Sequence, residues 1–196
     1  MEENFDALEV IARTRGKVTM ERTHTGENLF LLWGALTAVF FILQWALWEW
    51  LHEDWCLWIW TAAVLIGWPW MIVLLRKDHQ RTHSRTHEAK IILDCWVLIG
   101  AACAIGGFVF GLADKFESFA MPLISLLIGM GAFVTGEVNR FRPKVIGGEA
   151  GVVIGIISYT LQGELWTWQM PALALVATVS LVIPGILYKK SIKNGI

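Results

Sequence analysis

Long apolar runs separated by short polar connectors dominate the chain. Six stretches approach the roughly 20 apolar residues that a helix needs to cross a bilayer. They cover residues 29–47, 56–75, 91–113, 118–136, 145–161 and 170–188. The Gly67-Trp68-Pro69 interruption in the second stretch is of a kind that membrane helices tolerate when neighbours satisfy the freed carbonyls. The pattern predicts an all-α integral membrane protein, with six transmembrane helices bundled over residues 29–188.

The two ends of the chain are polar and flank this apolar region. Residues 1–28 lack the apolar stretch of a cleavable signal peptide. Within them, Phe5, Leu8 and Ile11 share one face of a possible helix, and acidic residues occupy the other. This pattern predicts an amphipathic N-terminal cytoplasmic helix that lies against the inner leaflet or the cytoplasmic end of the bundle. We interpret residues 189–196 as a cytoplasmic tail.

The distribution of positive charge predicts the orientation. Of the 16 Lys and Arg residues, 15 lie in segments on one predicted side of the membrane. Only Lys115 lies in a connector on the other side. Those 15 precede the first span, join spans two to three and four to five, or follow span six. Because cytoplasmic connectors carry the excess of Lys and Arg, both termini are expected in the cytoplasm.

Tryptophan gives a second, independent indication of the same orientation. Eight of the 12 Trp residues fall at the predicted outer ends of their spans, where an interfacial aromatic belt is expected. They are Trp45, Trp48, Trp50, Trp55, Trp58, Trp60, Trp166 and Trp168.

Small residues at intervals of three and four follow one face of spans three, four and five. Such stripes let membrane helices approach closely, since packing replaces the hydrophobic drive that lipid removes. The stripes are Gly100, Ala104, Gly107 and Gly111; Ser125, Gly129, Ala132 and Gly136; and Gly147, Gly151, Gly155 and Ser158. We expect spans three to five to form the tight centre and spans one and two to be peripheral. The alternative is that glycine is simply common in membrane helices.

The histidines of the connector "DHQRTHSRTH" form a weak candidate metal site. His79, His83 and His87 recur every four residues, so a helix would place them on one face. A closed zinc site needs about four ligands, the chain has no Cys-x2-Cys pair, and Arg81 and Arg85 would repel a cation. A basic connector that faces lipid headgroups and is helical at both ends is the favoured interpretation.

Three carboxylates lie in or beside the spans, where burial of a charge is costly and often functional. Asp94 is one turn into span three, Glu149 is one turn into span five, and Glu137 ends span four. One hypothesis is a polar vestibule, open to the cytoplasm, that binds a cation or a proton. The other, which their distance from the midplane favours, is a ring of interfacial ion pairs with nearby Lys and Arg.

The motifs of intramembrane catalysis are missing from the spans. They contain no paired Asp, no Ser with His, no His-Glu-x-x-His motif and no nucleotide-binding loop. We therefore expect no catalytic residues and no cofactor, and the chain is more consistent with a protein that is not an enzyme. The expected partners are the lipid bilayer and a second copy or another membrane protein, rather than nucleic acid.

Three short segments carry a resemblance to a known group. "ENLFLLWGAL" in the first span, "RTHEAKII" before the third and "LVIPGILYKK" at the end of the sixth resemble a group of uncharacterised six-span bacterial inner-membrane proteins. Trp33-Gly34 and Pro184-Gly185 carry the match, together with the amphipathic N-terminal segment. The resemblance implies the bacterial inner (cytoplasmic) membrane and a six-helix fold, and it implies no substrate.

Two functional hypotheses follow. The first is a non-catalytic membrane module: a scaffold, a sensor or an assembly subunit. The second is a small transporter or channel for an ion or solute that works as an oligomer. Short connectors and charges confined to the interfaces favour the first. Gly-rich helices and the Asp94 and Glu149 carboxylates favour the second, although no convincing internal repeat of the kind common in transporters is present.

Overall fold

The computed structural model describes residues 28–51, 59–81, 87–112 and 119–193. Within these ranges the chain is helical and contains no strand. The N-terminal helix covers Asn28–Leu51. It is followed by α2 (Ile59–Arg81), α3 (His87–Leu112), α4 (Met121–Val138) and α5 (Arg142–Ser158). The last long helix is built from four consecutive parts: η3 (Gly163–Trp168), α6 (Gln169–Ala177), η4 (Thr178–Val182) and α7 (Ile183–Lys193).

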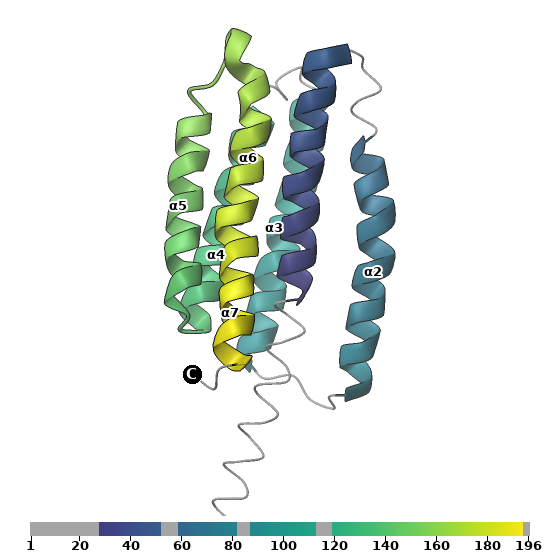
Figure 1. The fold of residues 1–196 in the computed structure, drawn as a ribbon, viewed down its shortest axis with the longest axis vertical. Helices are drawn as coiled ribbons and strands as arrows, with labels where there is room; N and C mark the ends of the chain where they lie inside the picture. The colour runs from purple at the N-terminus through teal and green to yellow at the C-terminus, as the bar shows by residue number, and fades with distance from the viewer. Residues whose placement is uncertain (1–27, 52–58, 82–86, 113–118, 194–196) are drawn as a thin grey trace, which may run out of the picture.

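The long helices run side by side as one bundle (Figure 1). Each of the six apolar stretches of the sequence overlaps one of them. Three of the described helices are long and apolar enough to cross a membrane, namely Asn28–Leu51, Met121–Val138 and Gly163–Ser191, and Leu65–Arg76 is a shorter apolar helix. The described part of the chain is therefore helical and suited to association with a membrane. The predicted amphipathic helix around Phe5 lies outside the described residues.

The bundle has two ends with different residues. The tryptophan end is where the N-terminal helix ends and η3 begins, at the top of Figure 1. The lysine end is where α5 begins, at Arg142-Pro143-Lys144, and where α7 ends.

Helices α4 and α5 form a close hairpin. A short turn joins them, in which Arg140 adopts a positive φ of 53° and Phe141 donates its amide N–H to the carbonyl of Gly136. The two backbones then run in contact. A Cβ added at Gly129 would lie 2.6 Å from the amide nitrogen of Val152, so only glycine fits there. Close backbone approach through small residues is the packing mode expected of membrane helices.

The last helix packs against both α4 and α5 and changes its winding there. Pro184 is fully buried and has no amide N–H to donate to the carbonyl one turn earlier. The preceding segment, η4, is π-helical, as is common where an α-helix must absorb a local misfit. Ser180 in η4 donates its hydroxyl to the carbonyl of Gly147 at 2.8 Å. A hydrogen bond therefore joins the widened turn to the glycine face of α5.

Two helices add detail to the packing predicted from the sequence. The N-terminal helix is less buried than α4 and the last helix, yet it meets the bundle closely: Phe41 is buried, and a Cβ on Gly34 would lie 2.7 Å from Cβ of Leu181. Helix α3 does not use its small-residue face at Gly100, where a Cβ would meet no atom within 4 Å. It packs on α4 instead through Trp96 and Ile99. Spacing gives a helix face but not the neighbour that the face meets, so the close packing predicted for this stripe stays a prediction.

The position of α2 does agree with the prediction. This helix lies at the edge of the bundle (Figure 1). Its contact with the N-terminal helix is made by small residues: Ala63 is buried, and a Cβ on Gly67 would lie 3.0 Å from the side chains of Trp33 and Leu36. Large side chains elsewhere on α2, among them Leu65, Trp68 and Trp70, are exposed.

Candidate functional site

The three predicted vestibule residues are exposed in the structure. Asp94 lies on α3, Glu137 lies near the end of α4 and Glu149 lies in the second turn of α5. Exposed carboxylates are compatible with a shared vestibule and with separate interfacial ion pairs. Both hypotheses therefore stay predictions.

The predicted histidine site falls outside the described side chains. Helix α2 continues to Arg81 and α3 begins at His87, so the connector is helical at both ends. His83 lies between these helices, outside the described residues, and the side chains of His79 and His87 are not described. Among the described residues, no group of three or more His, Cys, Asp or Glu side chains could hold a metal ion. Cys95 and Cys103 on α3 are free thiols.

Buried polar side chains mark the interior instead, and sequence reasoning overlooked most of them as a group. Each is less than about one-tenth exposed. They are Gln44, Ser125, Thr135, Lys144, Ser158, Thr167, Gln169 and Ser180. The usable signal was their placement within apolar runs, because a polar residue in a span normally faces the protein rather than lipid.

At the lysine end, a chain of contacts starts from Lys144. This residue was predicted as an orienting charge in a connector, yet its side chain is fully buried. Its Nζ lies 3.8 Å from the centroid of the Phe30 ring, within the range of a cation–π interaction. Trp96 packs on the same Phe30 ring at 5.0 Å between centroids. Lys144 thus contacts the N-terminal helix, which in turn contacts α3.

The chain of contacts continues into α4. Trp96 donates its indole N–H to Thr135 Oγ1 at 2.9 Å, and Thr135 donates its hydroxyl to the carbonyl of Gly131 at 2.7 Å. A Cβ on Gly131 would lie 3.2 Å from the Trp96 ring, so a small residue is needed for the indole to fit. Four helices (α5, the N-terminal helix, α3 and α4) are therefore connected through three side chains and one hydroxyl group.

At the tryptophan end, two pairs of indole rings join the N-terminal helix to η3. Trp45 and Trp168 lie 5.2 Å apart between centroids, and Trp48 and Trp166 lie 5.4 Å apart in a T-shaped arrangement. Thr167 donates its hydroxyl to Glu49 Oε1 at 2.9 Å. The aromatic residues of the predicted interfacial belt thus also form a specific contact between the first and last long helices.

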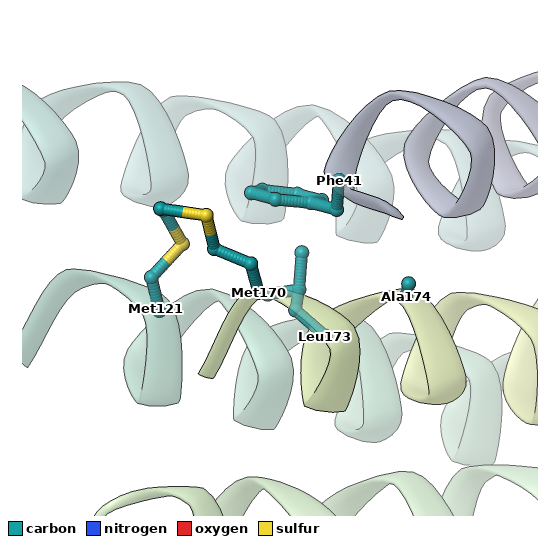
Figure 2. Close-up of a cluster of buried hydrophobic side chains, with 5 residues drawn as sticks. All are labelled: Phe41, Met121, Met170, Leu173 and Ala174. Atoms are coloured by element: carbon teal, nitrogen blue, oxygen red, sulfur yellow. The ribbon is translucent and has the colours of Figure 1, made fainter. Parts of the chain in front are cut away.

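Below these rings lies a cluster of buried apolar side chains, which we call the Met cluster. It consists of Phe41, Met121, Met170, Leu173 and Ala174, and Trp45, Trp166, Ala38 and Ile124 pack against it. Figure 2 shows the thioethers of Met121 and Met170 directed toward each other beside the Phe41 ring. Three helices therefore meet in one dry region, made by residues 38–45, 121–124 and 166–174.

The two best-formed hollows in the described part of the chain are open surface grooves with apolar walls. One, of about 460 Å³, is lined by Leu161, Leu165, Trp168, Pro171, Ala172 and Leu175. The other, of about 480 Å³, lies along the N-terminal helix from Ala38 to Ala46. Their walls suit acyl chains and offer no charged group to an ion.

None of the buried polar side chains lines either hollow. Ser158 and Thr135 donate to carbonyls of their own helices, and Ser180 donates to a carbonyl of a neighbouring helix. Comparison with protein-family models, with curated proteins and with solved structures gave no match.

Proposed function

We propose that this chain is a six-span protein of the bacterial inner membrane with both termini in the cytoplasm, and that it acts as a non-catalytic membrane module: a scaffold, a sensor or an assembly subunit. The lengths of the helices support six spans. Helices α2, α3 and α5 contain 23, 26 and 17 residues. At 1.5 Å per residue, even the shortest extends about 25 Å, close to the thickness of a hydrocarbon core.

The observation that carries the functional proposal is the packing of the centre. Helices α4 and α5 are in backbone contact at Gly129 and Gly136, and η4 is hydrogen-bonded to α5 at Gly147. A pathway for an ion or solute through one copy needs a polar, hydrated route between helices. Backbone contact along this seam favours a rigid module over such a route.

The exposed faces of α2 and α3 are the better surfaces for a partner. Leu65, Trp68 and Trp70 of α2 are exposed, and Gly100 of α3 faces open space. A helix from another membrane protein, or from a second copy, can approach a small residue such as Gly100 closely. A module that acts through assembly would present these faces and keep α4, α5 and the last helix as its fixed core.

The orientation is tested with reporter fusions in a bacterial host. A fluorescent protein fused after Ile196 is expected to fluoresce, and alkaline phosphatase fused at the same place is expected to be inactive. Phosphatase fused after Phe116, in the connector that contains Lys115, should be active. An active phosphatase at Ile196 would contradict the proposed topology.

The functional proposal is tested by site-specific photocrosslinking in cells. A photoreactive amino acid at Trp68 of α2 is compared with one at Val153 of α5, because both side chains are about half exposed. We expect a discrete protein adduct from position 68 and only lipid adducts from position 153. Equal lipid-only labelling at both positions would remove the support for a partner on α2.

The competing transport hypothesis has its own readout. Proton and potassium gradients are measured across sealed vesicles that contain the purified protein. We expect these gradients to decay at the same rate with the unmodified protein as with the Asp94→Asn and Glu149→Gln variants. A flux that either substitution abolishes would overturn the module and establish transport.

A further inference from the structure

The lysine end of the bundle carries three exposed cations on two helices that are in contact. Arg140 lies in the turn between α4 and α5, Arg142 begins α5, and Lys190 lies in the last turn of α7. The rings of Phe141 and Tyr188 pack in a T-shaped arrangement, 5.0 Å apart between centroids, and join that turn to α7. Each cation is within two residues of one of these rings, so all three lie at one level of the bundle. We call them the basic patch.

The nearby carboxylates leave the basic patch with a net positive charge. The first turn of α5 contains no acidic residue, and neither does α7. Glu137, in the last turn of α4, is the carboxylate closest in sequence to Arg140. Glu149 lies two turns along α5 from Arg142, about 10 Å toward the middle of the bundle. Arg and Lys side chains extend toward water in the other direction.

An exposed apolar side chain lies one turn from a cation of the basic patch on each helix. Ile146 is four residues from Arg142 and 63% exposed, and Ile186 is four residues from Lys190 and 54% exposed. Residues four apart share a helix face. Both isoleucines lie on the side of the cations that is closer to the middle of the bundle, because α5 begins and α7 ends at the lysine end. Each helix therefore presents a charge at its end and an apolar surface next to it.

This order of groups restricts the chemistry of the partner. An acidic peptide or a nucleic acid would use the cations and leave the isoleucines exposed. An anionic phospholipid uses both, because its phosphate pairs with the cations and its acyl chains cover the apolar surface. Arginine suits a phosphate in particular, since its planar guanidinium presents several N–H donors to the phosphate oxygens.

We propose that the basic patch is a binding site for the phosphate headgroup of an anionic phospholipid, whose acyl chains lie along the exposed apolar faces of α5 and α7. Basic surfaces at the ends of membrane helices attract such lipids. The site rests on the proposed membrane setting, and it is independent of whether the protein acts as a module or as a transporter.

Arg76 and Lys90 provide the matched control. Both are exposed, and they lie near the end of α2 and the start of α3, at the same end of the bundle (Figure 1). Lys90 is four residues from the exposed carboxylate of Asp94, so an acidic group shares its helix face where Arg142 has Ile146. Removing Arg76 and Lys90 deletes two positive charges from two helices and leaves the basic patch intact.

The test is native mass spectrometry of the full chain, purified in detergent and titrated with phosphatidylglycerol or with phosphatidylcholine. We expect the unmodified protein to prefer phosphatidylglycerol. The double variant Arg142→Gln, Lys190→Gln should bind phosphatidylglycerol about tenfold more weakly, because each basic side chain near an anionic headgroup contributes separately. The control variant Arg76→Gln, Lys90→Gln should lose less than about threefold. Unchanged binding of phosphatidylcholine shows that each variant is folded.

Three results would overturn the proposal. The first is equal binding of the two lipids by the unmodified protein, which would make an acidic protein segment the better occupant of the basic patch. The second is an equal loss in both double variants, which would mean general attraction to a basic surface. The third is equal affinity for glycerol 3-phosphate, which carries the phosphate without acyl chains and should bind at least about tenfold more weakly than the lipid.

The same preparation separates a failure of this site from a failure of the membrane setting. A chain recovered from the soluble fraction of the host would contradict the membrane setting and the lipid site together. A chain that detergent extracts from the membrane fraction, but that does not distinguish the two lipids, would contradict the site alone.

Discussion

Helices α4 and α3 carry stripes of small residues with similar spacing, yet the two stripes meet different surroundings. Gly129 on α4 faces backbone atoms of α5, whereas Gly100 on α3 faces open space. The same contrast extends to whole regions: α4, α5 and the last helix form a fixed core with the N-terminal helix, and α2 is attached at its edge (Figure 1). A small-residue stripe therefore permits close packing, and the opposite surface decides whether it occurs.

The largest expected difference between the two regions concerns leucine. Leu173 is fully buried in the Met cluster, and Leu65 on α2 is 68% exposed. We expect Leu173→Ala to lower the free energy of unfolding by about 2–5 kcal/mol because it leaves a cavity among packed side chains. Leu65→Ala should change it by less than about 0.5 kcal/mol. Thermal unfolding in detergent measures both, and equal losses would remove the distinction between core and edge.

Substitution of glycine tests the stripes directly. Gly129→Ala places a methyl group 2.6 Å from the nitrogen of Val152, so α4 and α5 must separate. The expected loss is about 1–3 kcal/mol, typical of overpacking. Gly100→Ala meets no atom within 4 Å and should leave stability unchanged or raise it by up to about 1 kcal/mol through helix propensity. A comparable loss at Gly100 would mean that α3 uses this face in the assembled protein.

A third comparison concerns phenylalanine. Phe30→Leu removes the ring that lies between Lys144 and Trp96. Loss of the cation–π and ring–ring contacts should lower stability by about 1–2 kcal/mol. Phe133→Leu, at a ring that is 36% exposed, is the control. The contact between Lys144 and Phe30 would be energetically unimportant if both variants unfolded at the same temperature.

The smallest expected effect concerns the threonine that joins the first and last long helices. Thr167→Val removes the hydrogen bond to Glu49 and keeps the shape of the side chain. A loss of about 1 kcal/mol is expected for one hydrogen bond of this kind. Thr160→Val, at an exposed residue that bonds only within its own turn, should be close to neutral. Chemical or thermal unfolding of the two variants in parallel checks the difference.

The positions of the helices along the chain were predictable, because a long apolar run has few alternatives to forming one long helix. The run over 145–161, for example, corresponds to α5 at Arg142–Ser158, and its displacement reflects Pro143, which suits the first turn of a helix. The rotation of each helix was harder to predict. Gly100 and Gly129 look alike in sequence, and only the surface that each one meets distinguishes them.

The candidate sites were less predictable than the fold for a similar reason. Lys144 was one of many basic residues in the charge count, but counting charges does not reveal that its side chain lies over Phe30. The π-helical turn at 178–182 has no pattern of its own beyond the proline that follows it.

The bond between Thr167 and Glu49 joins residues that are 118 positions apart, and this separation matters during synthesis. Chains emerge from the ribosome at roughly 5–20 residues per second. The N-terminal helix therefore waits several seconds before the residues that contact Trp45 and Glu49 exist. Until then its polar side chains must be held by lipid headgroups, water or an insertion factor, so the order of translation separates the insertion of this helix from its final packing.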